Sequence, residues 1–227
     1  VKSGLTLASK LTIGRTLGAG GCRYWYVYGK AGFGAAPIFS LLPATGIPVS
    51  FYGFGGGAFY HMRAVVDTAR DSVIYTPDNS VALGLKATVI LGTDGGGLAW
   101  NGDQSLEFVF SQGGNSYNLT NINLYSRNWF LAPLPARTNP VADVRGNGTL
   151  QISVNNFNIS GYFNFTADFK TLLQGNGTAQ ILFGPGNWFV KIGTREEPVD
   201  VHIYPLPPLP LDLAAKHYFQ IDKNGIL

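Results

Sequence analysis

The sequence predicts an all-β protein built from antiparallel sheets, arranged as a sandwich or as barrel-like sheets of short strands with long loops rich in Gly, Pro and Asn. Two observations carry this prediction. Short runs alternate between apolar residues and polar or small ones, which is the two-residue period of a half-buried strand. Clusters of Gly, Asn and Pro separate these runs. The composition of 30 Gly, 15 Phe, 11 Tyr and 4 Trp with only 13% charged residues argues against disorder.

The alternation locates the strands. The clearest run extends over 81–91 and places Leu85 and Val89 on one face, with Lys86 and Thr88 on the other. The same period predicts strands within 105–110, 149–154, 157–169 and 179–183, and two aromatic, Gly-rich runs predict strands at 23–30 and 49–62. The segments 63–71 and 211–218 are expected to form short helical turns.

Turn signals lie between the strands. One of them is Asn101-Gly102-Asp103, an Asx-Gly sequence of the kind found in tight turns. The run Gly146-Asn147-Gly148-Thr149 recurs as Gly175-Asn176-Gly177-Thr178. We expect each copy to form an Asn-Gly turn in front of a strand.

Two Pro-rich stretches suggest three regions. Residues 1–135 form a β-rich domain or half, and residues 136–204 form a second β-sheet region that carries the repeated Gly-Asn-Gly-Thr sequence. Residues 205–227 contain the run Pro205-Leu206-Pro207-Pro208-Leu209-Pro210 followed by a C-terminal segment. Such a run favours extended polyproline and predicts a rigid strap.

The composition argues against several functional classes. The net charge is only +3 and no run of Lys and Arg exceeds two residues, which disfavours nucleic-acid binding. The three His residues are far apart, the lone Cys22 excludes an intramolecular disulfide, and neither a Gly-x-Ser-x-Gly nucleophile motif nor a phosphate-binding loop occurs. We therefore expect no catalytic residues, no metal site and no cofactor.

Two sets of residues are candidate sites. Five Asn-x-Ser/Thr sequons are candidate glycosylation sites, although Asn, Gly and Thr are also common in β turns: Asn118, Asn147, Asn158, Asn164 and Asn176. Aromatic side chains are a candidate surface for stacking on a sugar or a partner protein, with core packing as the alternative explanation: Trp25, Tyr52, Tyr60, Trp100 and Trp129.

Two segments carry a resemblance to known proteins. The run from Tyr52 to Met62, Tyr-Gly-Phe-Gly-Gly-Gly-Ala-Phe-Tyr-His-Met, and the run from Trp188 to Thr194 resemble β-rich segments of large, uncharacterised secreted or surface proteins of Bacteroidota-type bacteria. The resemblance implies a piece of a larger extracellular architecture and implies no activity. The start at Val1, without a signal peptide, is likewise expected of a processed piece of a longer precursor.

These observations favour a non-enzymatic structural or adhesive module of a secreted or cell-surface protein. We expect it to self-associate or to join other domains through exposed sheet edges, for example in a fibre, and a glycan is a further candidate partner. The alternative is a transmembrane β-barrel of an outer membrane, the one case that involves a membrane. Alternating strands favour it, whereas the Pro-rich segments and breaks in the alternation of several strands argue against it. A further alternative is a carbohydrate-binding or carbohydrate-active domain, which would draw its carboxylates from Asp67, Asp71 and Glu107.

Overall fold

The computed structural model describes residues 5–17, 21–34, 36–41, 49–67, 72–137, 143–169, 173–205 and 212–226. It is 74% strand and 3% helix, and it confirms the predicted all-β, antiparallel fold. Fifteen strands form one sheet and two form a separate hairpin among the described residues.

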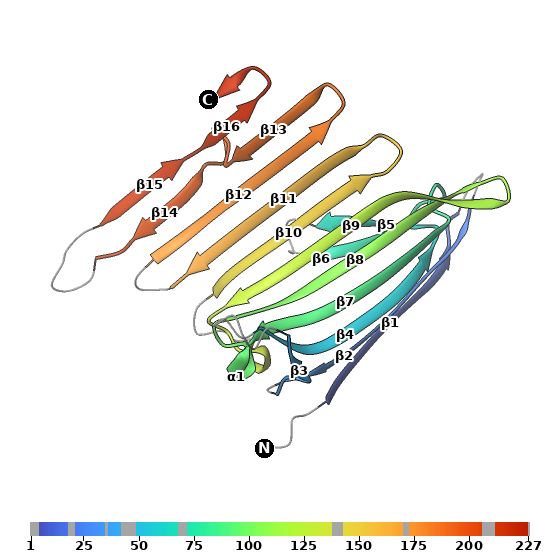
Figure 1. The fold of residues 1–227 in the computed structure, drawn as a ribbon, viewed down its shortest axis with the longest axis horizontal. Helices are drawn as coiled ribbons and strands as arrows, with labels where there is room; N and C mark the ends of the chain where they lie inside the picture. Colours follow the sequence, from blue (N-terminus) through green and yellow to red (C-terminus); the bar gives the residue numbers. More distant parts are fainter. Residues whose placement is uncertain are drawn as a thin grey trace.

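The large sheet is mainly a meander in which each strand pairs with the next one along the chain (Figure 1). Its order is β1 (Leu5–Arg15), β2 (Arg23–Phe33), β4 (Val49–Tyr60), β7 (Leu83–Thr93), β8 (Trp100–Gly113), β9 (Ser116–Phe130), β10 (Asp143–Ser153), β11 (Asn158–Asp168), β12 (Leu173–Gly184), β13 (Asn187–Ile192), β16 (Phe219–Asp222) and β17 (Gly225–Ile226). Three short strands lie off this path: β3 (Phe39–Ser40) pairs with β4, β14 (Val199–Ile203) pairs with β12, and β15 (Leu213–His217) pairs with β14.

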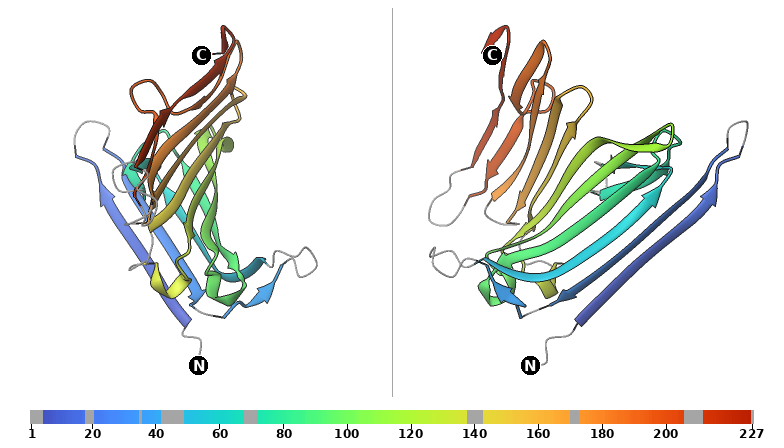
Figure 2. Two further views of the ribbon diagram at one scale, coloured as in Figure 1. Left: turned by 90° about the vertical axis from the view of Figure 1, so that its left-hand side faces the viewer. Right: turned by 45° about the vertical axis from the view of Figure 1, so that its right-hand side comes forward.

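The sheet bends into a trough, and the hairpin of β5 (Met62–Asp67) and β6 (Ser72–Pro77) lies on its inner side (Figure 2). Tyr75 of β6 packs on Tyr26 of β2, with ring centroids 4.3 Å apart, and its hydroxyl donates to Glu107 of β8 at 2.5 Å. Two strands separate β2 from β8, which is about 14 Å on a flat sheet. One side chain can reach both strands because this face is concave.

The buried core is small and lies between the hairpin and the inner face. It consists of Tyr26, Phe59, Met62, Val81 and Val109, with Tyr24, Tyr28 and Tyr75 packed against it. Two short helical turns, α1 (Asp94–Gly97) and η1 (Leu134–Ala136), lie at one end of the trough. In the part of the chain that the structure describes, no second sheet covers the outer face.

The predicted helical turns at 63–71 and 211–218 are wrong, because β5 and β15 occupy most of both segments. The pairing of Val65 with Ile74 in β6, and of Ala215 with Val201 in β14, gives their backbone groups strand partners. Segments this short have no periodicity that separates helix from strand. Residues 68–71 and 211 lie outside the described residues.

Three predicted turns are also wrong. Asn101, Gly102 and Asp103 lie within β8, and the two Gly-Asn-Gly-Thr runs lie within β10 and β12. The glycines make room for aromatic rings of β11. A Cβ at Gly148 would lie 3.3 Å from the ring of Phe163, and one at Gly177 would lie 2.6 Å from the ring of Phe165.

The sheet continues from the first predicted region into the second. β9 pairs with β10 in unbroken register from Phe130 with Val144 to Asn121 with Ser153. The domain boundaries of 1–135, 136–204 and 205–227 stay predictions. Residues 206–211, most of the predicted Pro-rich strap, lie outside the described residues.

Candidate functional site

The register of the sheet sorts its residues onto two chemically different faces, since alternate residues of a strand point to opposite sides. One row of directly paired residues on the outer face crosses ten strands and is apolar throughout: Leu11, Val27, Ala58, Leu85, Phe108, Ile122, Ile152, Ile159, Phe183 and Trp188. The next row lies on the inner face and is largely polar: Lys10, Tyr28, Gly57, Lys86, Glu107, Asn123, Gln151, Ser160, Leu182 and Phe189.

The outer face is apolar and exposed. Leu7 and Ile13 of β1 are each 72% exposed, and Phe54 of β4 is 56% exposed. Among the outward-facing residues of the ten strands that these rows cross, the charged ones that the structure describes are Arg15 and Arg23, which pair with each other at the ends of β1 and β2. Contiguous apolar surface of this extent marks an interaction surface rather than a water-exposed one.

Aromatic side chains lie towards both ends of this outer face. Trp25 and Tyr60 stack at one end, with ring centroids 6.3 Å apart, and Phe110 of β8 lies at the same end, paired with Leu83 of β7. Trp100 lies at the opposite end of β8, where its indole N–H donates to the Asn128 side-chain oxygen at 3.0 Å. Phe110 and Trp100 bound a stretch of strand about 33 Å long, which a tilt of about 40° reduces to a band of about 25 Å.

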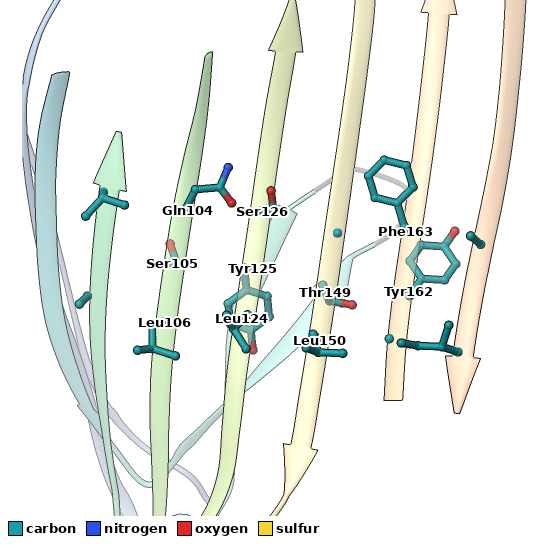
Figure 3. A pocket seen from close by; sticks show the side chains of 16 residues that line it. Gln104, Ser105, Leu106, Leu124, Tyr125, Ser126, Thr149, Leu150, Tyr162 and Phe163 are labelled. Atoms are coloured by element: carbon teal, nitrogen blue, oxygen red, sulfur yellow. The ribbon is translucent and has the colours of Figure 1, made fainter. Parts of the chain in front are cut away.

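A shallow groove of about 600 Å³ crosses the middle of the outer face (Figure 3). Leu106, Leu124 and Leu150 line it from three neighbouring strands, with Phe163 at one side. Gly148 and Gly161 also line it, and the absence of their side chains leaves the hollow. The groove therefore offers an apolar floor suited to an aliphatic chain.

The inner face contains a buried polar cluster around Glu107, which is completely shielded from solvent. Its carboxylate accepts hydrogen bonds from the Tyr75 hydroxyl at 2.5 Å, the Asn123 side-chain amide at 2.9 Å and the Tyr125 hydroxyl at 3.4 Å. Burial raises the pKa of Tyr75 and of Tyr125 well above the ordinary value, and the negative charge of Glu107 raises both further. The two phenols are therefore donors that stay protonated.

Lys86 completes this Glu107 cluster. Its ammonium donates to the Tyr75 hydroxyl at 3.2 Å and lies 5.4–5.6 Å from the ring centroids of Tyr28, Tyr75 and Tyr125. Three ring faces around one ammonium form a cation–π cage. Burial lowers the pKa of Lys86, and the nearby carboxylate of Glu107 partly opposes that effect.

A second polar cluster surrounds Asp103 on the same face of β8. Its two carboxylate oxygens pair with Lys30 at 2.5 Å and with Arg137 at 2.9 Å. The Arg137 guanidinium also donates to Asn101 at 2.5 Å and lies 4.0 Å from the Trp129 ring centroid. Burial by itself would raise the pKa of Asp103, but the two cations outweigh it and hold this pKa below its ordinary value.

The predicted aromatic set does not form one surface. Trp25 and Tyr60 stack on the outer face, and Trp100 lies at its other end. Tyr52 is fully buried and donates to the Thr93 carbonyl at 2.7 Å, while Trp129 is buried under Arg137 on the inner side.

The five sequon asparagines share one face, since alternation and register place all of them on the inner side of their strands. Asn147 and Asn164 pair directly, Asn118 and Asn176 are exposed, and Asn158 is half-buried.

Of the proposed carboxylates, Glu107 is enclosed by its hydrogen bonds, the side chain of Asp67 is not described, and Asp71 lies outside the described residues. Sequence reasoning did not connect Tyr75 and Lys86 with Glu107, because alternation assigns a face but does not show which residue of the distant hairpin covers it.

No protein-family model, curated protein or solved structure that was compared with the chain matches it. Within the described residues, no helix is long and apolar enough to cross a membrane. The same residues contain no group of three or more His, Cys, Asp or Glu side chains placed to hold a metal ion.

Proposed function

We propose that the chain forms part of the wall of a transmembrane β-barrel at the cell surface, with the outer face in the lipid of an outer membrane and the inner face lining a polar interior. The observation that carries this proposal is the register itself, which gives an apolar row across ten strands beside a largely polar row across the same strands. Strands that alternate apolar-out and polar-in, with aromatic residues at both ends of a band about 25 Å tall, are typical of such walls.

The energetics support a covered outer face. Fully burying one large aliphatic or aromatic side chain contributes about 1.5–3 kcal/mol. The outer face exposes Leu7, Leu11, Phe54, Leu85 and Leu124 among many others. Leaving about ten such side chains in water forgoes about 15 kcal/mol, as much as the whole stability of a typical domain. Lipid supplies this cover without a second protein layer.

The two edges of the sheet leave backbone groups without strand partners in the described residues. In the described residues, the outer edge of β1 has no strand partner, and the other end of the sheet finishes at the short strands β15 and β17. Lipid does not tolerate unpaired backbone groups, so a wall of this kind closes through further strands. We propose that another copy or another part of a larger assembly supplies them by strand addition, which keeps the self-association expected from the sequence.

The test compares a charge on the two faces during folding into liposomes. Leu124→Arg places a charge in the middle of the outer face, whereas Gln151→Arg places the same charge on the exposed, inner side of the neighbouring strand β10. We expect L124R to destabilise the vesicle-inserted protein by about 2–4 kcal/mol, seen as a lower free energy of unfolding, and Q151R to change this free energy little. The measurement is a urea titration of the vesicle-bound protein.

Equal effects of the two variants would contradict the proposal. So would a wild-type protein that stays a soluble monomer in detergent-free buffer and does not bind vesicles. An ordered polymer formed without lipid would instead support the fibre-forming structural module, with the outer face buried between copies.

A further inference from the structure

We propose that the inner face binds a small acidic sugar, a monosaccharide that carries a carboxylate or a phosphate. The site is a groove of about 270 Å³, lined by residues of β2, β6, β7, β8, β9, β10 and β11, which we call the inner groove. This volume is near the lower limit for ligand pockets and suits a ligand of monosaccharide size. The inner groove lies on the face opposite the apolar one, so the proposal does not depend on how the outer face is covered.

The charges around the inner groove favour an anion. Lys30, Lys86 and Arg127 line it, and Asp103 is its one lining carboxylate among the described residues. Both oxygens of Asp103 are already paired, with Lys30 and with Arg137. Glu107 lies behind the lining, enclosed by Tyr75, Asn123 and Tyr125. Four cations therefore face two carboxylates that are already engaged, which leaves a positive potential in the groove.

Arg127 is the residue best placed to hold the anionic group. Its side chain is exposed to the groove, and its guanidinium lies 5.1 Å from the Trp129 ring centroid, which restrains it from one side. A cation–π contact does not use the N–H groups of a guanidinium, which can still donate to a ligand. Arg binds carboxylate and phosphate oxygens in pairs, so a fixed guanidinium recognises either group.

The remaining lining suits the hydroxyl groups and ring of a sugar. Asn147 and Asn164 pair directly on β10 and β11 and line the groove beside Arg127. Tyr28, Tyr125 and Tyr162 also line the groove, and the Tyr125 hydroxyl is directed to Glu107 behind the lining. Amides and hydroxyls both donate and accept hydrogen bonds, as sugar hydroxyls require, and aromatic faces pack on the apolar side of a pyranose.

The experiment is a calorimetric titration of the folded protein in detergent solution with four probes: glucuronate, glucose 6-phosphate, glucose and inorganic phosphate. We expect each acidic sugar to bind at least tenfold more tightly than glucose and than inorganic phosphate. The affinity for the acidic sugars should fall as NaCl increases, because the charged contact is partly exposed.

Three variants test whether the inner groove is the binding site. Arg127→Gln should weaken binding of glucuronate and glucose 6-phosphate at least tenfold. Lys216→Gln removes one positive charge from β15, where the side chain is 66% exposed and pairs with Asp200 outside the groove, and should leave both affinities unchanged. Arg127→Lys keeps the charge but loses the paired donors, so we expect intermediate affinity. Circular dichroism confirms that each variant is folded before titration.

Several outcomes would overturn the proposal. If glucose bound as tightly as the acidic sugars, the acidic group would contribute nothing to binding. If inorganic phosphate bound as tightly as glucose 6-phosphate, the sugar would contribute nothing. Equal losses in R127Q and K216Q would place the effect outside the inner groove. Because these titrations use the folded particle itself, a failed vesicle experiment leaves them interpretable, and their failure leaves the membrane proposal standing.

Discussion

At the scale of single residues, the inner face shows how a carboxylate can lie in a dry environment. Glu107 loses contact with water but gains three side-chain donors, and the Lys86 ammonium donates to the same Tyr75 hydroxyl. A buried polar group without partners is costly, and these three donors satisfy the side-chain oxygens of Glu107 in the absence of water. The cluster therefore fixes the hairpin to the sheet at one defined position.

The phenols of this region predict a pH effect at the alkaline end. Burial raises the pKa of Tyr26, Tyr75 and Tyr125, while unfolded Tyr titrates near pH 10. Above pH 10 the unfolded chain has lost protons that the folded chain keeps, so the stability present below pH 10 falls as the pH rises. We expect the phenolate absorbance at 295 nm to rise later in the folded protein than in urea.

The variant Tyr75→Phe tests whether the buried phenols cause the late rise of the phenolate absorbance. It removes one late-titrating phenol and should reduce the difference between the folded and the urea titrations. Tyr117→Phe is the matched control, because this side chain is 59% exposed. If all 11 tyrosines ionised together near pH 10 in the folded protein, the buried cluster would be contradicted.

At the scale of elements, the pairing of β4 with β7 makes a prediction about packing. Phe59 lies directly opposite Gly84, and a Cβ added at Gly84 would lie 1.8 Å from the Phe59 ring. Gly84→Ala should therefore force the ring out of the core and lower the free energy of unfolding by about 2 kcal/mol. Denaturant titration of the folded protein measures this loss.

Gly29 of β2 provides the control for Gly84→Ala. Nothing lies within 4 Å of a Cβ built there, so Gly29→Ala should be neutral or stabilise the strand by up to about 1 kcal/mol. Similar losses in both variants would show that the Phe59 contact does not limit the packing of β4 on β7.

The elements also show what the sequence was able to predict. The run at 81–91 predicts a strand that the structure places at Leu83–Thr93, with Leu85 and Val89 on one face and Lys86 and Thr88 on the other, because eleven residues of alternation favour the two-residue period. The Gly-Asn-Gly-Thr runs were misread as turns, because the reason for their glycines is the rings of Phe163 and Phe165 on another strand. The hairpin of β5 and β6 was missed because its strands are short and its contacts are distant.

At the scale of the whole molecule, the four tryptophans report which face meets lipid. Trp25, Trp100 and Trp188 are on the outer face, and Trp129 is buried on the inner side. In vesicles of brominated lipid, we expect the fluorescence of the first three to be quenched and that of Trp129 to be largely unaffected. Quenching should therefore persist in Trp129→Phe and nearly vanish in the variant with Phe at the other three positions.

A uniform quenching of all four tryptophans would contradict a two-faced wall, and no quenching at all would contradict membrane insertion. Alternation alone separates two faces within a run such as 81–91, whereas the register of the sheet joins those faces across ten strands. The candidate site could not be predicted from the sequence. The inner groove depends on the curvature that brings β2 and β8 to the same hairpin, and the sequence of a single strand does not show that curvature.

The glycines of β4 have a consequence for the shape of the trough. Gly53, Gly55 and Gly57 point to the concave side, where a Cβ would lie 2.4–2.6 Å from neighbouring atoms, whereas Phe54 between them points outwards. Side chains converge on the inside of a bend and diverge on its outside, so a stretch of strand with glycine at each inner position from 53 to 57 is a line along which the wall can turn sharply. The curvature of the trough therefore depends on three positions of one strand, because a methyl group at any of them would press against atoms of the neighbouring strand β2.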